Sequence, residues 1–179
     1  YSLPKLFIAV ILSMEARGGM SEIKLFLSWS RDDEKLKNSF LKLLKPRLEA
    51  VQAYKFTWWE DTFILPGEEW QPTIMEMLGK SDYIVQLISY SFVTSDFIRK
   101  YEIPGVGEAP LKKTLPVMIK DVSLDGSIEF HQIDKRQIYR GISGKSSYIS
   151  RKSDYSKEKF VEGFREAVVA RVENKIGYR

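Results

Sequence analysis

Apolar residues along the chain follow two patterns, short continuous runs and longer stretches with helical spacing. The clearest run is Tyr83–Ile88, which is apolar and rich in β-branched residues except for Gln86. A run of this kind predicts a strand that is covered on both faces, as in a parallel sheet. Further strands are predicted at residues 23–27, 56–60 and 114–119, with a short one at residues 137–140.

Stretches of apolar residues with helical spacing lie between the first three predicted strands. Asp32 or Asp33 can cap a helix, and Pro46 is expected to bend or end that helix locally. A second, short helix is predicted at residues 70–78 and is closed by Gly79. The inward positions expected on the first helix are Leu36, Phe40, Leu43, Leu44, Leu48 and Val51.

Two more helices follow the strand Tyr83–Ile88. After a loop, Ser95 and Asp96 are suitable N-cap residues for a short helix, which must stop near Ile103 because a proline and a glycine come next. Ser156 is expected to cap the last helix, and Gly177 to end it. The inward positions expected on this last helix are Phe160, Val161, Phe164, Val168, Val169, Val172 and Ile176.

Strands that alternate with helices predict an α/β fold. We expect a single flavodoxin-like domain with a central parallel sheet flanked by helices on both faces. In open sheets of this kind, ligands bind in the crevice at the carboxyl ends of the strands. The loops at residues 28–33, 60–70 and 89–97 are therefore expected to meet at one edge.

The predicted helix after the third strand carries one acid near its end. Seven residues at about 100° each bring Glu102 back almost onto the azimuth of Ser95, so that both can face one ligand. Glu102 also sits at the unfavourable end of the helix dipole, where Arg99 and Lys100 are the stabilising choices. A ligand contact and a solvated surface acid are both compatible with this position.

Composition narrows the classes of function. The chain has 179 residues, 44% hydrophobic and 29% charged, which suits one domain with a proper core. It has no Cys and one His, which excludes thiolate catalysis, disulfides and multi-histidine metal sites. The net charge of +4 is spread without a basic tract, so direct nucleic-acid binding is not expected. These features fit a cytoplasmic protein that acts away from membranes.

Residues 1–19 look separate from the domain at residues 20–179. Their apolar run is shorter than the roughly 20 residues that span a bilayer, and its resemblance to a signal peptide is loose. Met20 is a plausible native start. The segment is a natural extension, an expression remnant or an extra helix packed on a neighbour.

Four pieces of sequence in series resemble the TIR (Toll/interleukin-1 receptor) domain, in particular its bacterial kind. They are KLFLSWSRDDE, WWEDTFILPGEEW, SDYIVQLISYSFVTSDFIRKYEI and LPVMIKDV, which fall in the expected order from about Lys24 to Ile119. The resemblance implies either an enzyme that cleaves the nicotinamide-ribose bond of NAD, or an interaction module. NAD is then the substrate, and no further cofactor is implied.

The resemblance also implies roles for single residues. Glu102 matches the essential acid of the enzymatic members, although Phe97 stands where many have Trp, with one more residue before the acid than in the animal pattern. The loop after the first strand, usually Ser-Tyr-Ser, corresponds to Ser28, Trp29 and Ser30. The mobile loop before the second helix corresponds to residues 61–70, with Pro66 and Gly67 in the familiar place.

The chemistry fits one carboxylate. Nicotinamide leaves as a neutral molecule, so the reaction needs no strong acid, only an anion that stabilises an oxocarbenium-like transition state. Glu102 takes that role and Ser95 a hydrogen bond to ribose or phosphate. Trp29 either stacks on a substrate ring or packs as a half-buried aromatic. Arg31 either meets the pyrophosphate or is a solvated charge. Asp61, Leu65 and Trp70 contact ligand or only fix their loop.

Competing classes are weighed against these residues. A non-catalytic TIR scaffold that signals by homotypic TIR-TIR assembly would not need Glu102, but assembly and catalysis are compatible. A phosphoacceptor receiver domain needs an Asp after the third strand, where Ser89 stands. A dinucleotide-binding oxidoreductase needs a Gly-rich turn after the first strand, which is absent. The expected setting is antiphage defence with a fused or separate sensor protein.

Overall fold

A four-stranded parallel sheet organises the molecule. The computed structural model describes residues 20–60, 70–96, 113–130, 133 and 137–174. Its strands are β1 (Ser21–Ser28), β2 (Tyr54–Trp59), β3 (Tyr83–Ile88) and β4 (Lys113–Met118), in the order β2-β1-β3-β4. All three pairings are parallel. The predicted α/β, flavodoxin-like fold is confirmed, and the segment at residues 1–19 lies outside the described residues.

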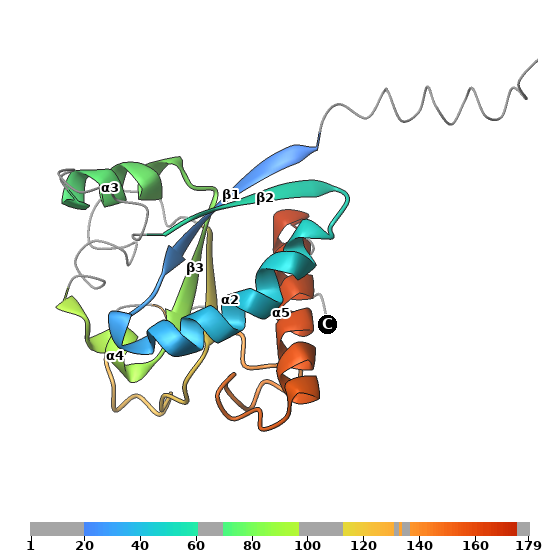
Figure 1. Ribbon diagram of the computed structural model, residues 1–179. Coiled ribbons are helices and arrows are strands. Elements are labelled where there is room, and N and C mark those ends of the chain that lie inside the picture. The colour runs from blue at the N-terminus through green and yellow to red at the C-terminus, as the bar shows by residue number, and fades with distance from the viewer. Residues whose placement is uncertain (1–19, 61–69, 97–112, 131–132, 134–136, 175–179) are drawn as a thin grey trace, which may run out of the picture.

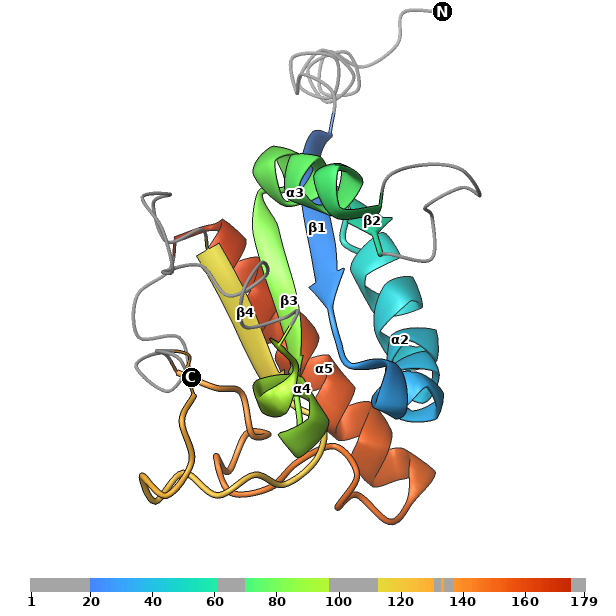
Figure 2. The same ribbon diagram turned by 90° about the vertical axis from the view of Figure 1, so that its left-hand side faces the viewer.

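Helices cover both faces of this sheet (Figures 1 and 2). A short 3-10 turn, η1 (Arg31–Asp33), leads into α2 (Glu34–Glu49), which packs beside α5 (Asp154–Val172) on one face. The helix α3 (Trp70–Lys80) lies on the other face, and the short α4 (Tyr90–Thr94) follows β3 directly. The carboxyl ends of β1 and β3 therefore lead straight into helical turns.

Alternating side chains in β1 explain the two covered faces. Leu25 and Leu27 belong to the core that α2 and α5 close, whereas Phe26 packs with Ile84 and the apolar side of α3. The larger core contains a group of aromatic rings around Phe40, contributed by α2, α5 and the segment before α5. Its members are Phe40, Tyr148, Phe160 and Phe164, all 2% exposed or less.

A second apolar cluster lies at the carboxyl ends of β3 and β4. Ile88, Phe92 and Met118 pack there against the segment that follows β4. The short strand predicted at residues 137–140 is an isolated bridge, in which the Tyr139 N–H donates to the Pro116 carbonyl at 2.9 Å. This bridge, together with the buried side chain of Ile138, holds the segment against the outer edge of β4.

Three helix boundaries differ from the sequence prediction. Pro46 does not end α2, because Leu44 and Leu48 on either side of it are fully buried and their packing outweighs the local cost. Ser153, not Ser156, is the N-cap of α5; Ser156 is the third helical residue and completes a capping box. The last described helical residue of α5 is Val172, with Glu173 as its C-cap, so Gly177 does not end it.

Two smaller differences concern α3 and α4. Gly79 lies inside α3 and does not close it, since the helix runs on to Lys80. The residues predicted as a loop after β3 form α4, because Ser89 caps this turn by accepting the N–H of Phe92 at 3.0 Å. The polar sequence around Ser89 is therefore a helix start.

Candidate functional site at the carboxyl ends of the strands

The segment after β1 lies at the carboxyl edge of the sheet, as the sequence predicts. Ser28 ends β1 and is fully buried, Trp29 is half-buried, and Ser30 is buried and precedes η1. Arg31 is exposed. Ser28 pairs in register with Gln86 of β3, so the site candidates from β1 lie beside the central strand.

Ser95 follows α4 at the same edge. Its backbone is extended, its N–H donates to the Phe92 carbonyl at 3.3 Å, and Asp96 after it is helical. Ser95 is thus the C-cap of α4, and the helix predicted to start at Ser95 continues into residues that lie outside the described part of the chain. Trp70 begins α3. Asp61, Leu65, Phe97 and Glu102 lie outside the described residues.

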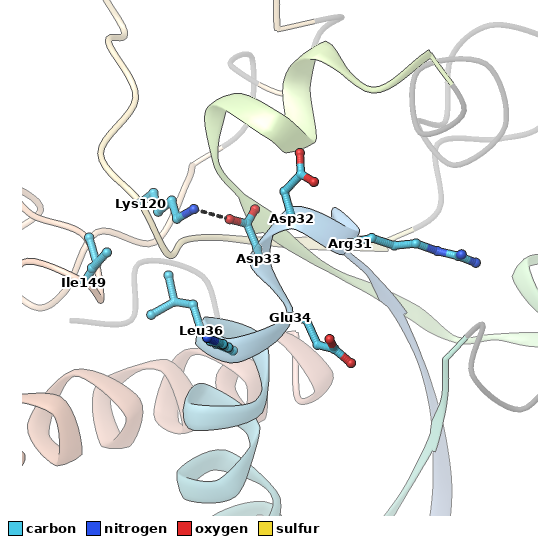
Figure 3. Close-up of a pocket in the computed structure, with 8 residues that line it drawn as sticks. Arg31, Asp32, Asp33, Glu34, Leu36, Lys120 and Ile149 are labelled. Carbon is cyan, nitrogen blue, oxygen red and sulfur yellow. Dashed lines mark ion pairs between the residues drawn. The ribbon is translucent and has the colours of Figure 1, made fainter.

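A buried carboxylate joins three of the strand ends. The side chain of Asp33 has no exposed surface, and it accepts a hydrogen bond from the hydroxyl of Ser89, at the end of β3. The ammonium of Lys120, which follows β4, lies 2.5 Å from Asp33 Oδ1, and Figure 3 shows the two side chains pointing at each other. Asp33 occupies the N-cap position of α2, as predicted, but its side chain makes no capping hydrogen bond there. Its carboxylate reaches across the sheet edge instead.

The remaining strand end is held by Lys37, one helical turn further along α2. Lys37 Nζ donates to Glu60 Oε2 at 2.8 Å, directly after β2, and both side chains are less than a tenth exposed. The same ammonium lies 4.0 Å from the ring centroid of Trp29, after β1. Lys45 approaches Glu60 from the solvent side at 3.4 Å. One face of Trp29 is thus occupied by an ammonium, which fits the packing alternative for this residue.

Together these contacts form what we call the α2 clamp, defined as Asp33, Lys37, Glu60, Ser89 and Lys120. Asp33 and Lys37 are four residues apart, so they project from neighbouring positions on one side of the helix start. Through Asp33 and Lys37, the start of α2 contacts a residue that lies one or two positions after the end of each strand. These residues are Trp29, Glu60, Ser89 and Lys120. Among the described residues, the first positions of the three loops predicted to meet here are joined through these contacts.

The environment of Glu60 shifts its titration. Burial alone raises the pKa of Glu60, but the hydrogen bond and charge of Lys37, with a further contribution from Lys45, outweigh burial and lower the pKa below its ordinary 4.5. A carboxyl group whose pKa is lowered on folding stabilises the folded state above its unfolded pKa. That contribution is lost as the pH falls through the lowered value.

We therefore expect acid to erase the benefit of Glu60. At neutral pH, Glu60→Gln should unfold at a lower urea concentration than the wild type, and the gap should narrow as the pH drops below 4.5. Urea titrations of both proteins at a series of pH values measure this gap. Glu76→Gln, on an exposed helical ion pair, is the matched control and should show little gap at any pH. A gap for Glu60→Gln that is independent of pH would contradict the assignment.

A shallow pocket of about 590 Å³ opens beside the clamp. It is bordered by η1, the first turn of α2, Lys120 and Ile149, and its lining carries three acidic and three basic side chains. Arg31 points away from Lys120 in Figure 3. The charged side chains that line this pocket therefore sum to no net charge.

Gln86 was not singled out from the sequence as a site residue. It is 1% exposed in the centre of the sheet, and both polar atoms of its amide are without a hydrogen-bond partner in the described structure. A buried amide without partners costs roughly 1 to 3 kcal/mol. Nothing in the described residues explains its retention.

Sequence reasoning also missed Lys37 as a buried residue. A lysine in a charged helix is usually solvated, but Lys37 precedes Leu41, Leu44 and Leu48 at spacings of four, seven and eleven residues. Those spacings place it within the apolar stripe of α2, which was the available signal. Asp33 was noticed only for its local capping ability.

These features define a class: a flavodoxin-like α/β domain whose candidate site lies at the carboxyl edge of a parallel sheet. Comparison with the models of known protein families and with characterised proteins finds no match to this chain. Among the described residues, no helix combines the length and apolar character needed to cross a bilayer. The same residues contain no group of three or more His, Asp or Glu side chains arranged to hold a metal ion.

Proposed function

We propose that this protein is a TIR-type NAD glycohydrolase or cyclase that releases nicotinamide and leaves ADP-ribose or a cyclic isomer. The observation that carries the proposal is the position of the segments that resemble the family. The segments after β1 and after β3 lie at the carboxyl edge of the sheet, where such sheets bind ligands. Two segments far apart in sequence, at Asp33 and Ser89, are in direct contact there.

In the proposed reaction, the bond between ribose C1′ and the nicotinamide nitrogen breaks, and its electron pair goes to the nicotinamide ring. The ribose is left as an oxocarbenium-like centre, which the Glu102 carboxylate stabilises. Attack by water gives ADP-ribose and a proton, whereas attack by an adenine nitrogen gives a cyclic product. Ser95 contributes a hydrogen bond to the ribose or a phosphate, and no other cofactor is required.

The proposed setting is the cytoplasm, in antiphage defence, with activity switched on by assembly of several copies and by a fused or separate sensor protein. The second candidate function, a non-catalytic TIR scaffold, rests on the same fold. The two candidates differ in one requirement, the acid at Glu102.

The decisive experiment measures nicotinamide release from NAD by the purified protein, at high concentration with a crowding agent. We expect Glu102→Gln to lower the rate by about 100-fold or more, because the developing positive charge loses its anion. Glu76→Gln, which removes an exposed acid from α3, is the control and should leave the rate unchanged. If a folded, self-associated wild type releases no nicotinamide, the scaffold function is favoured. If the wild type and Glu102→Gln release nicotinamide at equal rates, another residue is the acid.

A further inference from the structure

Lys37 is an unusual residue for a helix core. Its side chain is 5% exposed and lies on the sheet side of α2, among residues that form the apolar core. Removing an ammonium and a carboxylate from water is costly, and an apolar pair of similar volume in such a place is often equally stable or more so. Stability is thus a weak reason for the Lys37–Glu60 pair.

The geometry of the pair indicates a different reason. Lys37 directs its ammonium to Glu60 at 2.8 Å and over the Trp29 ring at 4.0 Å, so one group contacts the residue after β1 and the residue after β2. Trp29 lies between two candidate site residues, Ser28 and Ser30, and Glu60 immediately precedes Asp61 in the chain. A methylene surface could fill the same space, but it would not impose a direction on either neighbour.

We propose that Lys37 is a positioning residue, which holds Trp29, after β1, and Glu60, after β2, in the geometry that the carboxyl-edge site needs. The inference rests on the proposed NAD site for its functional meaning, but its structural part can be measured without activity. Lys45 contacts the same Glu60 carboxylate from a side chain that is 34% exposed. Its ammonium lies over the ring of Trp58, not that of Trp29, and this makes Lys45 a natural control.

The test replaces the ionic pair by an apolar one, in the double variant Lys37→Met with Glu60→Leu. We expect the variant to unfold at a urea concentration close to that of the wild type, while kcat/KM for NAD falls about tenfold or more through misplaced groups. Lys45→Met should keep kcat/KM within about twofold, since it leaves the buried contact in place. Wild-type activity in a stable double variant would overturn the proposal.

Hydrogen–deuterium exchange supplies the arm that does not depend on catalysis. Amides of residues 28–31 should exchange about tenfold faster in the double variant, while amides of β3 keep their wild-type rates. Unchanged exchange at residues 28–31 would overturn the proposal, whether or not the wild type cleaves NAD. A wild type that does not cleave NAD would refute only the proposed function. If the double variant does not fold, Lys37→Met alone replaces it, because Glu60 then keeps its contact with Lys45. Wild-type kcat/KM or unchanged exchange at residues 28–31 in that variant would overturn the proposal in the same way.

Discussion

Lys120→Met is expected to lower the free energy of unfolding by about 3 kcal/mol, because it leaves the buried carboxylate of Asp33 without its cation. The Asp33 side chain has no exposed surface, and it accepts a hydrogen bond from the hydroxyl of Ser89. Breaking a buried pair costs roughly 3 to 5 kcal/mol. The lower end applies because Lys120 is itself 37% exposed, so part of its interaction is already screened by solvent.

Urea unfolding of three proteins tests this expectation. Lys120→Arg keeps a cation beside Asp33 and should recover most of the loss. Lys145→Met removes an exposed lysine from the same region of the chain and should change stability by less than about 0.5 kcal/mol. Equal stability of Lys120→Met and Lys145→Met would contradict the expectation. It would mean that Lys120 does not compensate the charge of Asp33 and does not belong to the α2 clamp.

Phe40→Ala should destabilise the protein by about 3 to 5 kcal/mol. Phe40 is fully buried, and its ring lies 5.3 Å from that of Tyr148 and 5.8 Å from that of Phe164, measured between ring centroids. Truncation removes these contacts and leaves a cavity between α2 and α5 that two rigid aromatic neighbours can only partly fill.

Phe40→Leu is the matched control for that cavity, because it keeps most of the volume and should cost clearly less. Urea unfolding followed by far-UV circular dichroism compares the two variants with the wild type. Equal losses for Ala and Leu would show that the aromatic contacts, not the filled volume, dominate at this position. A loss below about 1 kcal/mol for Phe40→Ala would contradict the proposed packing of α2 on α5.

The strands were predictable from the sequence because their signal is local. Tyr83–Ile88 was predicted with both of its ends correct, since a buried strand is a nearly continuous apolar run, interrupted here by Gln86. Helix starts were harder. Ser153 and Ser156 are both good caps three residues apart, and only the hydrogen bonds between them show which comes first. The helix does not end at Pro46, because burial of its neighbours, which the sequence does not reveal, outweighs the local penalty.

The site was predictable in place but not in its contacts. The order of strands and helices puts Ser28, Ser30 and Ser95 at the carboxyl edge. Asp33 is different, because its partners Ser89 and Lys120 are brought to it only by the fold. Local patterns gave Asp33 the role of a cap, a short-range task, and could not show that a distant lysine and serine compete for the same carboxylate.

The order β2-β1-β3-β4 has a consequence for synthesis of the chain. Of the four strands described, β1 leaves the ribosome first and is central in the finished sheet, and one of its edges waits for Tyr83 and Ile84, which pair with Leu25 and Phe26. The face of β1 that α2 covers is complete only when α5 arrives from the end of the chain. Nascent β1 therefore has one unpaired edge until β3 is made and an incompletely covered apolar face until α5 is made, and in these intervals it is most open to wrong pairing.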